Sequence, residues 1–112
     1  MSAYILMAMT NAQPGREDEY NLWFDNVHIP EILAVGGFES VQRLQLAAVQ
    51  RTPAPHPYKF AALYSIETED LAGTLNALGK AVQSGTKTNA SDPTQRALWV
   101  YELLGNLKKT GI

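Results

Sequence analysis

The segment Tyr20-Asn21-Leu22-Trp23-Phe24-Asp25-Asn26-Val27-His28-Ile29-Pro30 holds the most informative pattern in this chain. Four of its apolar residues recur at spacings of three and four, which predicts one buried helical face: Tyr20, Trp23, Phe24 and Val27. His28 directly follows that face and is one of only two histidines in the chain. Pro30 disturbs a regular helix, because proline has no N–H and crowds the carbonyl one turn back. The pattern therefore places a titratable side chain where a core helix stops.

The predicted helix begins after the turn cluster at residues 10–15. Three acidic residues at 17–19 suit the first turn of a helix, where the macrodipole favours negative charge. The helix is expected to run from about residue 14 or 16 to Val27. A further short turn at 30–34 is compatible with proline at a helix start and would end at Gly36-Gly37.

Apolar patterns around this helix predict four strands and a second helix. The expected strands cover residues 3–9, 38–48, 58–67 and 96–104. The first of them is apolar throughout, which is typical of a strand buried on both faces. The second helix is expected to begin at Thr68 as N-cap. Its apolar stripe comprises Leu71, Leu75, Leu78 and Val82. A polar loop at 84–93 is long enough to act as a lid.

This order of elements, βαββαβ, predicts an α+β fold of the ferredoxin-like type over a single domain, residues 1–112. Such a fold has an antiparallel four-stranded sheet with both helices on one face. The other face would be too apolar for water, because six apolar residues are expected to contribute to it: Tyr4, Leu6, Phe60, Tyr64, Leu98 and Val100. We therefore expect a homodimer whose sheets pack face to face.

Composition excludes several classes of function. The net charge is −2 without a basic stripe, so nucleic acid is not an expected partner. No apolar run reaches the roughly 18 residues that span a bilayer, and the start lacks the basic region of a secretory signal. There is no cysteine, which excludes disulfides and thiolate metal sites. A cytoplasmic protein without membrane contact is expected.

The segment from Trp23 to Leu33, together with Gly36-Gly37-Phe38 and Arg43, resembles the signature of the EthD-like branch of the dimeric α+β barrel superfamily. Members of that branch show an aromatic–acid–x–x–His–x–Pro stretch, a Gly-Phe turn and a strand that carries arginine. Gly36 stands where many members have proline. The resemblance implies a dimeric α+β barrel. Relatives include polyketide cyclases, muconolactone-type isomerases, dehydratases and cofactor-independent monooxygenases.

His28 is the leading candidate for acid–base catalysis, because an ordinary imidazole pKa near 6.5 allows proton exchange at neutral pH. Asp25 lies three residues earlier, so on a continuous helix it shares a face with His28 and could orient the imidazole. The alternative is that His28 caps the C-terminus of the helix.

Arg43 and Tyr64 are candidate stabilisers of a developing oxyanion. The alternatives are a cross-strand ion pair of Arg43 with Glu39 or Glu102, and a packing role for Tyr64. Four aromatic residues are expected to line a substrate pocket: Tyr4, Phe24, Trp99 and Tyr101.

The chain contains no Gly-rich phosphate loop, no HExxH motif and no nucleophile elbow. With two histidines and no cysteine, neither a metal site nor a cofactor is expected, although His28 could in principle ligate haem iron. The predicted function is that of a cofactor-independent lyase, isomerase or cyclase acting on a small, largely apolar carbonyl or phenolic compound. A cofactor-independent monooxygenase of an electron-rich phenol and a non-catalytic binding dimer are the alternatives.

Overall fold

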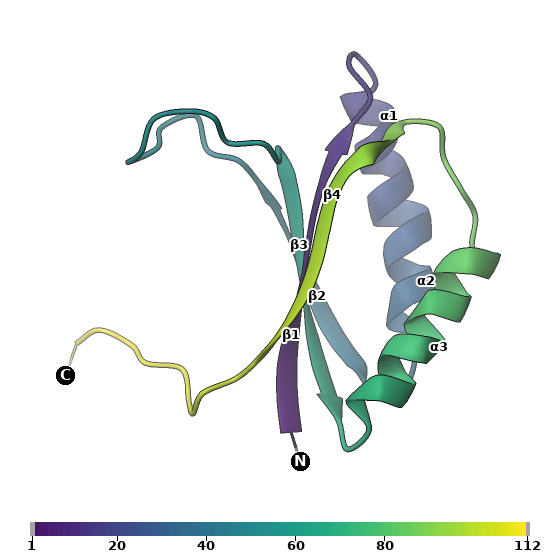
Figure 1. The fold of residues 1–112 in the computed structure, drawn as a ribbon, viewed down its shortest axis with the longest axis vertical. Helices are drawn as coiled ribbons and strands as arrows, with labels where there is room; N and C mark the ends of the chain where they lie inside the picture. Colours follow the sequence, from purple (N-terminus) through teal and green to yellow (C-terminus); the bar gives the residue numbers. More distant parts are fainter. Residues whose placement is uncertain (1, 112) are drawn as a thin grey trace.

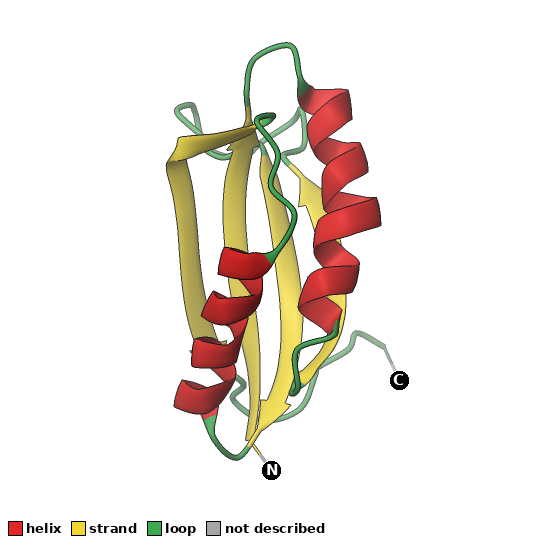
Figure 2. Ribbon diagram, turned by 90° about the vertical axis from the view of Figure 1, so that its right-hand side faces the viewer, coloured by secondary structure: helices red, strands yellow, loops and turns green. Residues whose placement is uncertain are grey.

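A computed structural model describes residues 2–111 as one four-stranded sheet with all helices on one of its faces (Figures 1 and 2). The elements are β1 (Ser2–Ala12), α1 (Glu17–Trp23), η1 (Phe24–His28), α2 (Ile29–Leu33), β2 (Phe38–Gln45), β3 (Phe60–Thr68), α3 (Leu71–Ser84) and β4 (Ser91–Glu102). The strand order is β2-β3-β1-β4, and every neighbouring pair is antiparallel. The predicted ferredoxin-like α+β fold is confirmed. No helix within the described range is long and apolar enough to cross a membrane.

The sequence predicted that the first helix would end at Val27, just before His28, but the helical path continues. Five residues, Phe24–His28, form a π-helical turn, and α2 continues directly from it through Pro30. The N–H of Ile29 donates to the carbonyl of Phe24, five residues back. Pro30 lies in the first turn of α2, where a missing N–H is tolerated. The proline therefore alters the hydrogen-bond ladder without ending the helical path.

The turn after α2 requires a glycine at position 37. Gly37 has φ +96°, which is the left-handed region that side chains rarely adopt. A Cβ there would also lie 3.2 Å from Cγ2 of Thr74 and 3.3 Å from the carbonyl oxygen of Glu67. The turn thus brings β2 close to the start of α3.

The sheet buries its core on the face that the helices cover. Directly paired residues point to the same face, and Leu6 pairs with both Tyr64 and Val100. The six apolar residues assigned to the uncovered face all belong to this helix-covered face, so that assignment was wrong. The outer face instead carries Ile5, Met7, Met9, Leu63, Trp99 and Tyr101. This face therefore still exposes apolar surface to water, since Trp99 and Tyr101 are 52% and 53% exposed.

A β-bulge in β2 changes the alternation predicted from Phe38 onward. Phe38 pairs with Ile66, but Ser40 pairs with Ser65, so Glu39 is an extra residue in the strand. Phe38 therefore shares the helix-covered face with Arg43, whereas a regular alternation of side chains from residue 38 would put the two on opposite faces. The strand also ends at Gln45, three residues before the predicted end.

The second helix, α3, is capped two residues later than predicted. The side chain of Asp70 accepts a 2.9 Å hydrogen bond from the N–H of Gly73, which makes Asp70 the N-cap. The hydroxyl of Thr68 instead accepts from the N–H of Asp70 at 3.1 Å. The buried face of α3 passes through Thr74, while Val82 from the predicted stripe is 41% exposed. After the helix, β4 begins at Ser91, five residues before the predicted start.

Candidate active site

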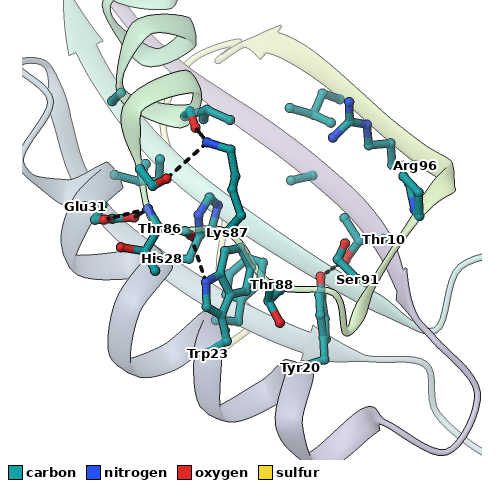
Figure 3. Close-up of a pocket in the computed structure, with 18 of the residues that line it drawn as sticks. Thr10, Tyr20, Trp23, His28, Glu31, Thr86, Lys87, Thr88, Ser91 and Arg96 are labelled. Carbon is teal, nitrogen blue, oxygen red and sulfur yellow. Dashed lines mark hydrogen bonds between the residues drawn. The ribbon is translucent and has the colours of Figure 1, made fainter.

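A cavity of about 750 Å³ lies between the sheet and the helices (Figure 3). Its apolar lining includes Leu6, Ala8, Phe24, Ile32, Leu78, Ala81 and Leu98. Its polar lining includes Thr10, Tyr20, His28, Glu31, Tyr64, Lys87 and Arg96. An apolar cavity with a few polar groups is typical of a small-molecule site.

His28 reaches this cavity from the π-helical turn. Its ring stacks on Trp23 with centroids 4.7 Å apart and planes 21° apart, and it meets the Phe24 ring in a T-shaped arrangement with centroids 4.9 Å apart. Within residues 2–111, neither ring nitrogen has a hydrogen-bond partner. Because the helix continues past His28, this residue does not cap a helix C-terminus. The imidazole is thus free to act on a ligand.

The surroundings of His28 favour its neutral form. Burial lowers the pKa of His28 below its usual 6.5, and the nearby Lys87 ammonium lowers it further. The Glu31 carboxylate opposes both effects and raises the pKa, but the net direction is downward. His28 is therefore mostly neutral at pH 7, which is the state that a general base requires.

Asp25 does not contact the His28 imidazole. Its side chain is 56% exposed and accepts a hydrogen bond from Arg43, with Oδ1 and Nη1 3.2 Å apart. The expected Asp25–His28 pair assumed a regular helix, and the π-helical turn changes which side chains are neighbours. Neither predicted role of Arg43 is found. Its ion-pair partner is Asp25 and not Glu39 or Glu102, and it does not line the cavity as an oxyanion stabiliser would. Instead, its guanidinium lies over the ring of Phe24, 4.3 Å from the centroid.

Tyr64 lines the cavity from β3 and is only 2% exposed. Burial raises the pKa of the Tyr64 hydroxyl above its usual 10, with a smaller contribution from Tyr20, while Arg43 opposes the rise. The hydroxyl therefore stays protonated at physiological pH. No hydrogen-bond partner for it is present in the described part of the chain. Tyr64 is thus an available donor at the cavity wall.

Of the four aromatic residues expected in the pocket, only Phe24 lines it. Tyr4 is on the helix-covered face but packs against the core outside the cavity. Trp99 and Tyr101 are on the opposite face of the sheet, because Trp99 pairs with the outward-facing Met7. Those two predictions were wrong, since an apolar strand gives no sign of which face each residue occupies.

No family model and no curated protein matches this chain, but solved structures with the same architecture do. An ethyl tert-butyl ether D (EthD) family protein from Bacillus halodurans C-125 shares 13% identity over 93% of this chain and 100% of its own, with a TM-score of 0.61. The haem-degrader MhuD from Mycobacterium tuberculosis, with two haems bound in its active site, shares 15% identity over 94% and 99%, with a TM-score of 0.62. A dimeric ferredoxin-like protein of unknown function from Thermobifida fusca YX shares 12% identity over 91% and 92%, with a TM-score of 0.56.

The fold is the ferredoxin-like one that these structures share. At 12–15% identity these structures establish the architecture that the segment around His28 predicted, and they leave the reaction open.

The segment between α3 and β4 closes one end of the cavity, and the sequence did not predict how it is held. The backbone N–H of Thr86 donates to both carboxylate oxygens of Glu31, at 3.1 and 3.3 Å. The indole N–H of Trp23 donates to the carbonyl of Thr86 at 3.0 Å (Figure 3). Lys87 folds back onto the last carbonyls of α3. The predicted lid is thus fastened to the same helical segment that carries His28.

The other end of the cavity is polar, and sequence patterns did not reveal it. The hydroxyls of Thr10 and Tyr20 are hydrogen-bonded to each other there. Arg96 pairs with Thr10 across β1 and β4, so both side chains point to the cavity side. Within residues 2–111, Arg96 has no ion-pair partner, and no group of three or more His, Cys, Asp or Glu side chains could hold a metal ion. Trp23, which was interpreted as a core residue, is also part of the cavity wall.

Proposed function

We propose that the cavity is an active site for acid–base catalysis without a cofactor, acting on a small, largely apolar carbonyl or phenolic compound as a lyase, isomerase or cyclase. The observation that carries this proposal is the His28 imidazole, which faces an apolar cavity with both nitrogens unpaired among the described residues. Burial keeps the imidazole mostly neutral and therefore able to accept a proton. Tyr64 supplies an unpaired, protonated hydroxyl to the same cavity.

In the proposed reaction, a ring nitrogen of His28 removes a proton from the carbon next to a substrate carbonyl. The electron pair of the broken C–H bond moves onto the carbonyl oxygen, and Tyr64 donates a hydrogen bond to the resulting enolate. The imidazolium then returns the proton to another carbon in an isomerisation, or to a departing hydroxyl in a dehydration. Apolar walls formed by Leu6, Ile32 and Leu98 lower the polarity around these charged intermediates.

Replacing Tyr64 with phenylalanine is expected to lower turnover by about 10²-fold, the usual effect of removing one oxyanion donor. The aromatic ring stays, so the melting temperature should change little. The matched control is Tyr101→Phe, which removes a hydroxyl from the outer face of the sheet. Equal turnover of Tyr64→Phe and the control would refute the donor role.

The pH dependence of turnover should follow His28. A base works in its neutral form, so the rate should fall as pH drops through the lowered pKa, with a midpoint below 6.5 and a plateau at pH 7. Glu31 raises this pKa, so Glu31→Gln should move the midpoint to lower pH. A rate profile from pH 4.5 to 8 measures both. A midpoint above 6.5, or an upward shift in the variant, would contradict the account.

A second candidate is oxygenation, which the same base would start by deprotonating an electron-rich phenol. Two observations favour this candidate. His28 presents a free imidazole to a cavity of about 750 Å³, and MhuD, which shares the fold, is a haem-degrader. Oxygen consumption with candidate phenols separates it from the first proposal. Addition of haem, followed by its absorption spectrum in wild type and His28→Gln, asks whether His28 ligates iron. Ligand binding without turnover in either assay would indicate a non-catalytic binding protein.

We also infer that the protein forms a homodimer through the outer face of its sheet. This face carries exposed Trp99 and Tyr101 beside Met7 and Leu63, an apolar surface that water disfavours. The segment that joins β2 to β3 and the C-terminal segment both extend on this side of the sheet, away from the helices (Figure 1). They would flank a second copy.

A further inference from the structure

The π-helical turn Phe24–His28 changes the direction in which His28 points. In an α-helix with 3.6 residues per turn, a residue five positions after another lies about 140° around the axis from it. Here His28 lies five positions after Trp23, yet the two rings stack with centroids 4.7 Å apart. The wider turn, closed by the hydrogen bond from Ile29 to Phe24, brings them onto one side.

Pro30 favours this turn from within the helix. In an α-helix, the N–H of residue 30 would donate to the carbonyl of Asn26, and a proline ring at that position collides with this carbonyl. A π-helical turn just before the proline moves the hydrogen bonding out of the regular four-residue pattern and relieves that collision. The proline then occupies the first turn of α2, where its geometry suits the helix.

Arg43 holds the same turn from the sheet. Its Nη1 donates to Asp25, the second residue of the turn, at 3.2 Å. Its guanidinium also lies 4.3 Å from the ring centroid of Phe24, the first residue of the turn. The Arg43 side chain is only 17% exposed, and its Nε is buried without a hydrogen-bond partner among the described residues. One arginine therefore contacts two of the five residues of the turn.

We propose that Pro30 and Arg43 are positioning residues, which hold Phe24–His28 in the π-helical turn and thereby keep His28 stacked on Trp23 and facing the cavity. The proposal rests on the proposed function only where activity is concerned. The position of His28 can be measured separately.

Fluorescence of Trp23 reports this position. The chain has two tryptophans, so a Trp99→Phe background leaves Trp23 alone. Protonation of a stacked His28 places an imidazolium against the indole and changes its emission with pH. The other charged groups that act on His28 are Glu31 and Lys87, and neither is altered in the variants below. A His28→Gln variant gives the emission without this titration.

In this background, Pro30→Ala is expected to abolish the pH-dependent change in Trp23 emission. The matched control Pro14→Ala, in the exposed turn before α1, should keep it. Asp25→Asn removes the carboxylate that Arg43 contacts, and it should weaken the change; because Asp25 is exposed, this variant should fold even if Pro30→Ala does not. Circular dichroism confirms folding in each case. A full pH-dependent change in folded Pro30→Ala would overturn the role of Pro30, and one in Asp25→Asn would overturn that of Arg43.

Turnover of the same variants separates this proposal from the proposed function. Loss of the stack with unchanged turnover would support the positioning role and refute catalysis by His28. A retained stack in the Pro30→Ala and Asp25→Asn variants, together with an inactive His28→Gln, would refute the positioning role and leave the catalytic one intact.

Discussion

Replacing His28 with glutamine should lower turnover by about 10²- to 10⁴-fold, the usual contribution of a general acid or base. Glutamine retains polarity and part of the imidazole volume but cannot exchange a proton near neutral pH. His28 has no hydrogen bond to the rest of the described chain, so its removal should cost little stability. Steady-state kinetics measures the loss, and thermal unfolding checks that the fold is intact.

The control for this variant is His56→Gln. His56 lies in the connection between β2 and β3, and within residues 2–111 its one hydrogen-bond partner is the hydroxyl of Thr52, at 3.3 Å. Its replacement should leave turnover unchanged. Full turnover of His28→Gln on a substrate that the wild type converts would show that His28 is not the acid–base group.

Replacing Trp99 with lysine should convert the proposed dimer into monomers. Trp99 lies on the outer face of the sheet and is 52% exposed in one copy. In a face-to-face dimer two lysine ammonium groups, one from each copy, would be buried without partners, at a combined cost of at least about 4 kcal/mol. That cost raises the dimer dissociation constant by about 10³-fold. Sedimentation at micromolar concentration measures the change.

Leu22→Lys is the matched control for the dimer test. Leu22 is a large apolar residue on α1 with 64% exposure, but it lies on the helical side of the molecule. The same charge placed there should leave the dimer unchanged. A dimer that persists in Trp99→Lys, or a wild type that is monomeric at micromolar concentration, would contradict the proposed interface.

The order and type of the elements could be predicted because most of them have a clear period. Phe60, Ala62, Tyr64 and Ile66 alternate along β3 and are all buried. The apolar strand β1 gave no such signal, since both of its faces are apolar. Its pairing partners Trp99 and Tyr101 were therefore assigned to the wrong side of the sheet.

Two local insertions account for the remaining errors at the site. The π-helical turn at Phe24–His28 and the β-bulge at Glu39 each add one residue to a regular element. A constant helical period would place the Asp25 and His28 side chains together, and a constant strand period would place Phe38 and Arg43 on opposite faces of the sheet. His28, Tyr64 and Phe24 were nevertheless expected at a pocket, and all three line it.

The central claim is that His28 is a neutral imidazole that contacts a ligand in the cavity. Nitrogen NMR of the His28 imidazole tests this directly in a His56→Gln protein, which leaves one histidine signal. The probe phenol is 2-naphthol. Binding of 2-naphthol is followed separately by Trp23 emission in Trp99→Phe protein. We expect a midpoint below 6.5 without ligand and displaced His28 nitrogen resonances once the phenol is bound. A His28 that is mostly charged at pH 7, or resonances that stay unchanged while the phenol binds, would contradict it.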